Sequence, residues 1–226
     1  MNAIIYYSNT NQSKYIAQYF EKKLGYPLID ICNIKKYSYQ NVVLIFPVYC
    51  QNIPDIVKGF LNKLEVRFLT VIATYGRMWY GNVLHQVQKQ YKHNIIAGAY
   101  IPTKHSFLSD KEFDDFNRLD VIVNKINNPS SVHIPKSFKN PLSNIFRDLR
   151  SRIGVKITRN ESCNHCGVCE NNCPNKAIIN GKTNRNCIRC LRCVTNCPVG
   201  ALKFYNRLPL RLYLNKKKTD KMVVYI

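Results

Sequence analysis

Acidic residues are scarce in this chain of 226 residues. Only 13 Asp and Glu stand against 34 Lys and Arg, giving a formal net charge of +21, which excludes a neutral globule of ordinary composition. No apolar run approaches the roughly 20 residues that a helix needs to cross a bilayer, so the sequence excludes an integral membrane protein. The first residues, Met1–Tyr7, contain no basic leader and only a short apolar run. We therefore expect no secretory signal, and a cytoplasmic protein.

Patterns typical of hydrolytic catalysis are also missing. No Ser/His/Asp or paired-carboxylate arrangement stands out, and we assign no catalytic residue. His165 lies inside a run of cysteines, where it would either hydrogen-bond to a sulfur or face solvent. The five histidines share no metal-ligand spacing: His85, His93, His105, His133 and His165.

Ten cysteines are present, and without a secretory signal they indicate metal binding rather than disulfides. Cys32 and Cys50 are expected to be inert apolar fillers, although Cys50 falls in a candidate ligand loop. The other eight lie between Cys163 and Cys197, and the charge divides in the same way, with a net of +6 before residue 127 and +15 after it. We therefore predict four segments: an α/β domain over residues 1–126, a linker with an amphipathic helix over 127–156, a cysteine-rich domain over 157–205, and a basic tail over 206–226.

The first domain alternates apolar runs with amphipathic helical patterns. Near-continuous apolar strands separated by helices are typical of a parallel sheet covered on both faces. The sequence therefore predicts an α/β fold with a doubly wound, five-stranded parallel sheet. The expected strands are 3–7, 28–31, 42–46, 68–73 and 95–101, and the expected helices are 12–24, 53–64, 81–92 and 110–126.

The cysteine-rich segment contains one pattern twice, at an offset of 24 residues. Each copy has three cysteines two residues apart and a fourth, followed by proline, after three more residues. Three such thiolates can wrap one cluster, while the fourth reaches across to the other. The sequence predicts a first site of Cys163, Cys166, Cys169 and Cys197, and a second site of Cys187, Cys190, Cys193 and Cys173. Two zinc knuckles are the alternative, but zinc favours four ligands in two pairs.

Residues 157–205 resemble the bacterial ferredoxins that carry two [4Fe-4S] clusters, at every ligand position. The resemblance implies a small α+β domain holding two such clusters. Arg189 and Arg192 lie only in the second loop, where their charge would favour the more negative, reduced cluster. We therefore predict that the second cluster has the higher reduction potential, unless both arginines point to solvent.

Candidate ligand loops follow three strands of the predicted sheet. The first loop is rich in hydroxyls and begins a helix, and the N-terminus of a helix is a favourable place for an anion. The two other loops carry aromatic residues that can cover a flat ring. The loop after the fourth strand also has glycines, which let the backbone come close to such a ring. All three fall at the carboxyl edge of the sheet, where open parallel sheets bind ligands. The candidate residues are Ser8, Asn9, Thr10, Asn11, Gln12, Ser13, Pro47, Val48, Tyr49, Thr74, Tyr75, Gly76, Trp79 and Gly81.

These loops resemble those of flavodoxin, and together with the cysteine-rich domain the chain is similar to flavodoxin–ferredoxin fusion proteins (EFR-type ferrodoxins), found mainly in anaerobes. The matching stretches are 3–84 and 157–205. The resemblance implies FMN in the first domain. Asn9 and Asn11 depart from the glycines usual in such loops; asparagine tolerates the left-handed backbone but adds side chains near the phosphate. A flavodoxin-like scaffold without flavin is the alternative.

Two further segments were interpreted from their apolar spacing. Residues 143–153 place Ile145, Leu149 and Ile153 four apart, which predicts an amphipathic helix. Residues 207–214 alternate apolar and polar positions, which predicts an edge strand, followed by a solvated lysine run at 216–218. Reversible contact of this basic tail with an anionic membrane surface is the alternative.

These predictions together favour an intracellular electron-transfer protein with two [4Fe-4S] clusters and FMN. Bound cofactors would lower the net charge only to about +15, so the expected partner is an acidic redox protein. An FMN-dependent reductase fed by its own clusters, or a basic iron–sulfur protein associated with nucleic acid, are the alternatives, although no nucleic-acid-binding motif accompanies the charge. The sequence leaves the oligomeric state open.

Overall fold

The computed structural model describes residues 1–108, 111–143, 147–216 and 218–226, with the backbone alone at 142 and 147–150. The chain forms two compact units. The first comprises residues 1–143 and 218–226, and the second comprises residues 144–217. The predicted linker is thus divided between the units, and the end of the chain returns to the first unit.

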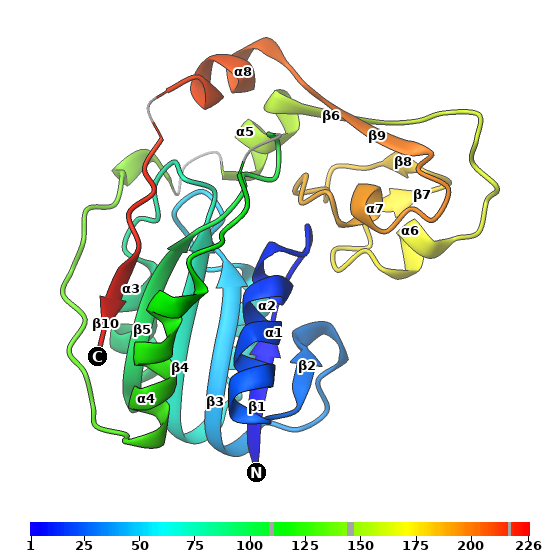
Figure 1. Cartoon of the computed structure of the whole chain (residues 1–226). Coiled ribbons are helices and arrows are strands. Elements are labelled where there is room, and N and C mark those ends of the chain that lie inside the picture. The colour runs from blue at the N-terminus through cyan, green and yellow to red at the C-terminus, as the bar shows by residue number, and fades with distance from the viewer. Residues whose placement is uncertain (109–110, 144–146, 217) are drawn as a thin grey trace. The chain divides into compact units, whose positions relative to one another are not determined.

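The first unit is built on a sheet whose expected strands all form (Figure 1). Five strands are parallel and run in the order β2-β1-β3-β4-β5. The strand order reverses between β1 and β3, which is where doubly wound sheets bind ligands. The strands are β1 (Asn2–Tyr6), β2 (Leu28–Asp30), β3 (Ser38–Pro47), β4 (Glu65–Tyr75) and β5 (Ile95–Pro102).

Helices cover both faces of this sheet, because the buried side chains of each strand alternate between two cores. Ile5 and Leu44 pack with α2 (Asp55–Leu61) and α3 (Val83–Tyr91). Ile4 and Ile45 pack on the other face with α1 (Gln12–Leu24) and α4 (Asp120–Asn127). The three layers are visible in Figure 1.

Local chemistry explains where the helices differ from their predicted bounds. α2 begins at Asp55 rather than residue 53 because Pro54 occupies its N-cap with an extended backbone. α4 is shorter than predicted, and part of the preceding stretch forms a 3₁₀ helix, η2 (Phe116–Leu119). Residues 109–110 lie outside the described residues. A second 3₁₀ helix, η1 (Ile31–Asn33), follows β2, and a third, η3 (Pro141–Ser143), ends the first stretch of the unit.

The predicted edge strand at residues 207–214 is wrong. These residues form helix α8 (Leu208–Leu214), with Pro209 near its first turn. Pro favours this position because a helix leaves its first N–H groups unpaired anyway. Leucines at every second position fit a strand, but the same residues at 210 and 214 are one helical turn apart.

A sixth strand, which the sequence interpretation did not include, completes the sheet. β10 (Val223–Tyr225) pairs antiparallel with β5, with Val223 opposite Tyr100 and Tyr225 opposite Gly98. Gly98 has no side chain, and a Cβ there would lie 3.0 Å from Ile134 and 3.7 Å from Tyr225. The sheet is therefore mixed and six-stranded rather than purely parallel and five-stranded.

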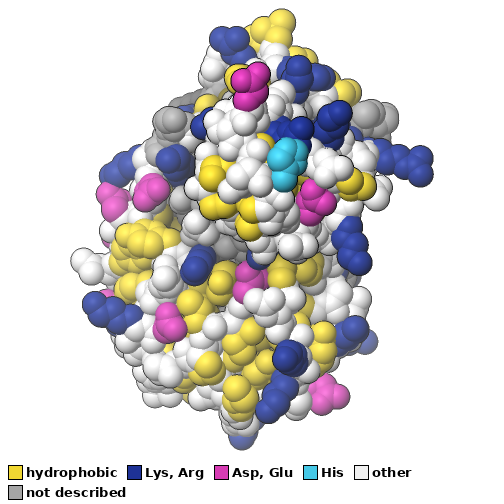
Figure 2. Space-filling view, turned by 90° about the vertical axis from the view of Figure 1, so that its right-hand side faces the viewer, with side chains coloured by type: hydrophobic (Ala, Val, Ile, Leu, Met, Phe, Trp, Pro, Cys, Tyr) yellow, Lys and Arg dark blue, Asp and Glu magenta, His cyan; other side chains and the backbone are white. Residues whose placement is uncertain are grey.

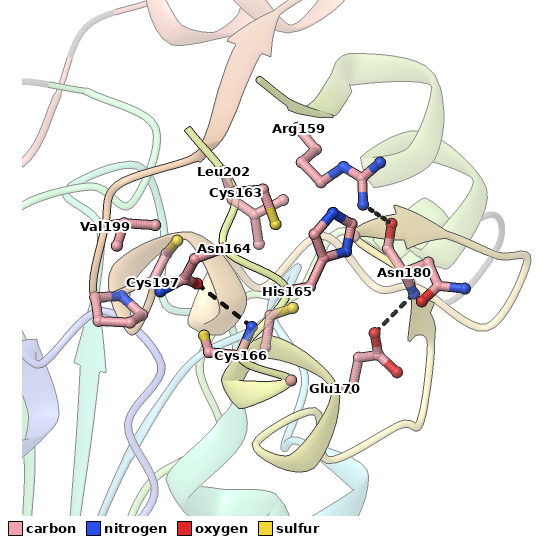
Figure 3. Close-up of a pocket in the computed structure, with 14 residues that line it drawn as sticks. Arg159, Cys163, Asn164, His165, Cys166, Glu170, Asn180, Cys197, Val199 and Leu202 are labelled. Atoms are coloured by element: carbon pink, nitrogen blue, oxygen red, sulfur yellow. Dashed lines mark hydrogen bonds between the residues drawn. The ribbon is translucent and has the colours of Figure 1, made fainter. Parts of the chain in front are cut away.

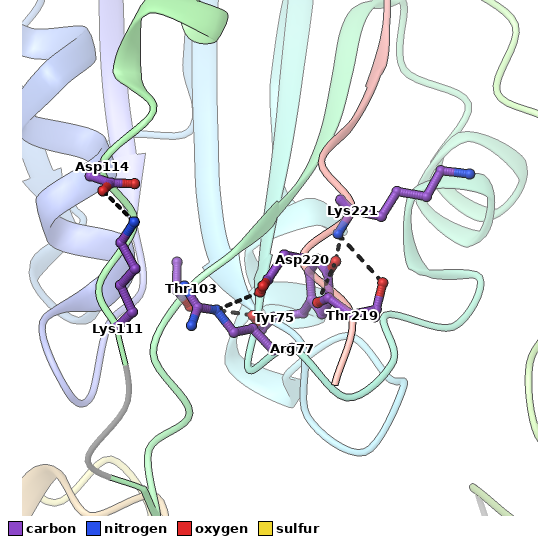
Figure 4. Close-up of polar contacts among 8 residues, drawn as sticks. All are labelled: Tyr75, Arg77, Thr103, Lys111, Asp114, Thr219, Asp220 and Lys221. Atoms are coloured by element: carbon purple, nitrogen blue, oxygen red, sulfur yellow. Dashed lines mark hydrogen bonds and ion pairs between the residues drawn. The ribbon is translucent and has the colours of Figure 1, made fainter. Parts of the chain in front are cut away.

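Polar contacts hold the approach to β10 on the loop after β4 (Figure 4). The Thr219 N–H donates to the Arg77 carbonyl at 2.7 Å, and Arg77 Nε lies 2.8 Å from Asp220 Oδ1. The buried Tyr75 hydroxyl donates to the Lys221 carbonyl at 2.7 Å. These contacts join residues more than 140 positions apart, so no local pattern predicts them.

The first half of the predicted linker is also packed on the first unit. Gln88 of α3 bonds both to the Val132 carbonyl and to the Ile134 N–H. Further along, the indole N–H of Trp79 donates to the Phe138 carbonyl at 3.0 Å. Residues 131–143 therefore form an ordered strap along α3 and the loop that precedes it.

The second unit contains two small antiparallel sheets and four helices among its described residues. β6 (Val155–Arg159) pairs with β9 (Leu202–Asn206), and β7 (Ile178–Ile179) pairs with β8 (Lys182–Thr183). The helices are α5 (Arg147–Gly154), α6 (Val168–Asn171), α7 (Arg192–Thr195) and α8. Of the predicted helix 143–153, residues 147–153 are helical in α5 and residues 144–146 lie outside the described residues. Among the described residues, no helix is long and apolar enough to span a bilayer.

Candidate iron–sulfur centre and sheet-edge loops

Four cysteines line one pocket of the second unit (Figure 3). Cys163, Cys166 and Cys169 come from the first cysteine run, and Cys197 comes from the end of the second run. Both runs thus contribute to this pocket, in the combination predicted for the first site. Cys166 is exposed and the other three are partly buried, so the pocket opens to solvent.

The other four cysteines also influence one another. The pKa of the Cys190 thiol is raised to about 11, mainly by burial and in smaller part by nearby Cys187 and Cys173. Burial likewise raises the pKa of Cys193 to about 12, again with contributions from Cys190, Cys187 and Cys173. These contributions place Cys173, Cys187, Cys190 and Cys193, the residues proposed for the second site, within electrostatic reach of one another. Since metal ligands bind as thiolates, cluster assembly would release the protons of these thiols.

The two cysteine loops have the same backbone conformation at an offset of 24. His165 and Arg189 share a left-handed backbone, with φ of 58° and 57°, and Gly167 and Leu191 share another, with φ of 71° and 64°. Helices α6 and α7 follow at the same offset. A left-handed residue between ligands turns the chain tightly, which brings thiolates spaced two residues apart around one centre.

Backbone N–H groups point at the sulfur of the fourth cysteine in each run. The Ala177 N–H donates to Cys173 Sγ and the Ala201 N–H to Cys197 Sγ, each at 3.2 Å. Burial by itself raises the pKa of Cys197, but N–H groups of residues 199–202 outweigh it and lower the pKa overall. Such donors stabilise the negative charge of a cluster-bound thiolate.

The donor set and its arrangement fit [4Fe-4S] clusters. Two all-cysteine quartets with N–H···S bonds supply the soft, negative ligands that iron–sulfur clusters need. No three His, Cys, Asp or Glu side chains within the described ranges lie close enough to hold a single metal ion. The thiolates of a [4Fe-4S] cluster bind four separate irons, so they surround a wider space than the ligands of one ion.

Polar residues that the sequence interpretation did not single out line the first pocket. The Glu170 carboxylate accepts the Asn180 N–H at 2.7 Å, and Arg159 Nη1 donates to the Asn180 carbonyl at 2.9 Å (Figure 3). These bonds hold the β7–β8 turn against the cysteine loop. His165 also lines the pocket and is exposed. A turn sequence at Asn180–Gly181 was the only local signal for this contact.

The two arginines of the second loop lie inward rather than only in solvent. Arg189 Nε donates to the Val155 carbonyl at 3.1 Å, and both arginines are partly buried. The charge of Arg192 lowers the pKa of Cys190, against the larger effect of burial. A third cation, Arg152, donates through Nε to the Cys187 carbonyl at 3.3 Å. The second site is therefore the more cationic of the two.

Replacing Arg192 with alanine is expected to lower the reduction potential of the second cluster. A unit charge several ångströms away contributes on the order of 100 mV at the effective dielectric of a protein. Resolved midpoint potentials of the two clusters in wild type and Arg192→Ala would measure the change. Arg185→Ala, at an exposed position in the same unit, is the control. Equal potentials in wild type and Arg192→Ala would refute the electrostatic role of this residue.

The candidate loops of the first unit meet at the carboxyl edge of the sheet. The Asn9 amide bonds to the Tyr49 hydroxyl, and the Ser13 and Thr74 hydroxyls lie 2.8 Å apart. The Val48 N–H donates to the Thr74 carbonyl at 2.8 Å, directly after Pro47 at the end of β3. The structure thus brings the loops after β1, β3 and β4 together, as predicted.

Their side chains are not equally available to a ligand. Ser8, Asn9 and Ser13 are buried, whereas Thr10 and Gln12 are half-buried and Asn11 is exposed. Asn11 has a φ of 62°, so it takes the left-handed conformation at the N-cap of α1 that glycine usually supplies. A phosphate would therefore be held by Thr10, Asn11, Gln12 and the first N–H groups of α1.

The aromatic residues of these loops differ from the prediction in what they contact. Tyr75 is 2% exposed and bonds to the C-terminal segment, so it belongs to the core. One face of Trp79 stacks on Tyr80, with ring centroids 4.9 Å apart, and 38% of Trp79 remains exposed. Tyr49 is half-buried, with its ring edge against Tyr7. Tyr49 and the free side of Trp79 are the aromatic surfaces left for a flat ring.

Both glycines of the loop after β4 lie against a side chain from another loop. A Cβ at Gly76 would come within 2.5 Å of the His105 ring, and a Cβ at Gly81 within 2.6 Å of Gln51. Gly81 also has a φ of 67°. These glycines allow neighbouring loops to pack closely. They do not serve the predicted purpose of letting a flat ring come close to the backbone. Cys32 is exposed, which contradicts its prediction as a buried residue, and Cys50 is exposed as well.

Comparisons with known proteins agree with the centre of the second unit. A search of curated proteins finds no match to the chain. A solved structure described as a "putative flavoprotein" from Bacteroides uniformis aligns with 46% of this chain and 91% of its own, at 14% identity and a TM-score of 0.41. The model of the 4Fe-4S binding domain matches residues 157–179 and 184–203, the two cysteine runs with their flanking strands. The second unit therefore contains a ferredoxin-type 4Fe-4S binding domain.

Proposed function

We propose that this protein transfers electrons through two [4Fe-4S] clusters and an FMN held by a flavodoxin-like sheet. The observation that carries the proposal is the crossed arrangement of the cysteines, in which Cys197 lines the pocket of Cys163, Cys166 and Cys169. Local zinc knuckles would use ligands from one run only, so the crossing favours the two-cluster ferredoxin arrangement. We assign the second cluster to Cys173, Cys187, Cys190 and Cys193.

The residues of the second unit position the clusters and adjust their potentials. When bound, each cluster accepts or releases one electron at a time. The chain contributes the thiolates, the N–H donors to Cys173 and Cys197, and the cations Arg152, Arg189 and Arg192 beside the second site. The exposed Cys166 makes the first site the more accessible to an external partner.

The proposal of FMN is supported by the sheet edge of the first unit. The strand order 2-1-3-4-5 is that of flavodoxin-like sheets, which bind FMN between β1 and β3. Thr10, Asn11 and Gln12 would hold the phosphate, and Tyr49 would cover the ring. Packing of Ser13 on Thr74 and of Asn9 on Tyr49 leaves fewer polar groups for the phosphate than the sequence predicted.

The cofactor content of protein purified without oxygen tests the proposal. We expect about eight irons, eight sulfides and one FMN per chain, since each cubane contains four irons and four sulfides. Zinc in place of iron would contradict the cluster proposal. Iron with no flavin would refute FMN and leave the iron–sulfur function intact.

A charge introduced at Asn11 tests the phosphate site. Asn11→Asp places a carboxylate next to the proposed phosphate, and repulsion is expected to weaken FMN binding by about tenfold or more, measured by fluorescence titration. Asn11→Gly is the matched control, because glycine also adopts a φ of 62° and adds no charge. Equal FMN affinity in both variants would show that no phosphate lies at this loop.

An acidic redox protein is the partner that we propose. The second unit has no Asp or Glu between residues 171 and 217, and on the face of the molecule in Figure 2 Lys and Arg side chains are spread widely. Complementary charge accelerates encounter, and salt screens it. Electron exchange with an acidic plant-type ferredoxin should therefore slow steeply as the salt concentration rises.

A further inference from the structure

Helix α8 has two apolar sides, and only one of them is used within the second unit. Leu210 packs near Gly154 at the end of α5, and Leu214 is 3% exposed. Successive helical residues are about 100° apart, which places Leu208 and Leu212 on the opposite side. These two leucines are 66% and 62% exposed. A helix with a second, uncovered apolar side is costly in water unless something covers it.

Cations flank the exposed leucines. In a regular helix Arg211 stands on one side of the Leu208–Leu212 row and Lys216, just after the helix, on the other. Both are exposed, and Lys216 Nζ lies 5.8 Å from the Tyr213 ring centre, so its stem covers an aromatic surface. Exposed Tyr205 and Arg207 precede the helix in the chain.

The stretch of chain around α8 contains no carboxylate. The nearest carboxylates in sequence are Glu170 and Asp220, so 49 consecutive residues contain none. Asp220 already pairs with Arg77 of the first unit. A segment that combines exposed Leu and Tyr with Lys and Arg, and contains no acidic residue, is complementary to an apolar layer under a negatively charged surface.

We propose that α8 docks the iron–sulfur unit reversibly on an anionic lipid bilayer. Leu208 and Leu212 would enter the boundary between headgroups and acyl chains, while Arg211 and Lys216 reach the phosphates and carboxylates of the headgroups. A fluid bilayer can accommodate two leucines that protrude from a convex helix surface, whereas a protein partner would need a groove of complementary shape. Because the helix has seven residues, the binding is weak and depends on the content of anionic lipid.

Sedimentation of the intact, cluster-containing protein with vesicles tests this proposal. We expect the protein to bind vesicles of phosphatidylcholine with phosphatidylserine, to bind phosphatidylcholine alone much less, and to be released by salt. Leu208→Gln with Leu212→Gln should lower the partition coefficient at least tenfold. Arg211→Gln should lower it about fivefold, which is the effect of one cation near an anionic surface.

Matched variants distinguish binding through this face of α8 from nonspecific adsorption of apolar side chains and from a general effect of positive charge. Ile179→Gln removes an equally exposed apolar side chain of the same unit, and Arg185→Gln removes an exposed cation outside α8. Both should bind like wild type, and iron content should be unchanged in every variant because all five substituted positions are exposed. Failure of wild type to bind phosphatidylserine vesicles, or equal losses in the controls, would overturn the proposal. So would cross-linking of an acidic ferredoxin through Leu212 without vesicle binding. None of these readouts depends on electron transfer.

Discussion

A chain in which Cys163 and Cys197 are both replaced with alanine is expected to keep about four of the eight irons that we propose, whereas Cys163→Ala with Cys173→Ala should keep almost none. The reason is that Cys197 lines the pocket of Cys163, while Cys173 lies with Cys187, Cys190 and Cys193. The first pair of substitutions therefore damages one cluster and the second pair damages both. A cluster that loses one of four ligands is released or strongly destabilised.

Iron and sulfide per chain, measured after purification without oxygen, give the result directly. The control is Cys32→Ala with Cys50→Ala, because both cysteines lie in the first unit, outside the two quartets. That variant should keep the full wild-type iron. The opposite pattern, with iron lost completely in Cys163→Ala/Cys197→Ala and half retained in Cys163→Ala/Cys173→Ala, would mean that each run binds its own cluster.

Replacing Met222 with alanine is expected to lower the free energy of unfolding of the first unit by about 2–4 kcal/mol. Met222 is 6% exposed and packs in the core formed by α1, α4 and one face of the sheet. Its removal leaves a cavity directly before β10, the strand that covers the edge of β5. The expected loss is large for a residue four positions from the end of the chain, where substitutions usually have little effect.

Fluorescence of Trp79 during urea unfolding measures this loss, because Trp79 is the only tryptophan of the chain and lies in the first unit. Val121→Ala is the control. Val121 lies on the exposed side of α4, so its replacement should change stability by less than about 0.5 kcal/mol. If Met222→Ala is as stable as the control, the C-terminal segment does not contribute to the core.

The parallel strands and the helices of the first unit were predictable because each carries its own apolar periodicity. α1 forms at the predicted residues 12–24, where Ile16, Ala17 and Phe20 face the sheet. β3 and β4 extend beyond their predicted apolar runs because pairing continues through polar residues, such as Ser38 with Glu65. Backbone hydrogen bonds do not require apolar side chains. An apolar run in the sequence therefore identifies the buried centre of a strand but not the residues at which the strand begins and ends.

The candidate sheet-edge site was only partly predictable. Strand ends and hydroxyl-rich loops showed that residues 8–13, 47–49 and 74–81 would meet at one edge. Tertiary packing decided which of these side chains remain available to a ligand. The Ser13 hydroxyl bonds to Thr74, and the Tyr75 hydroxyl bonds to the C-terminal segment. His105 also contributes to these loops, and no motif in the sequence marked it.

The sequence by itself indicated the iron–sulfur chemistry of this protein, because the type and spacing of the cysteine ligands repeat within two short runs. It also determined the layered α/β fold through local periodicity. Only the tertiary structure decided that residues 223–225 extend the sheet, that residues 131–143 pack along α3, and that residues 208–214 form a helix. Their conformation is stabilised by contacts with residues distant in the sequence. The leucines of residues 208–214 fit both a strand and a helix, so the surface against which they pack decides which of the two forms.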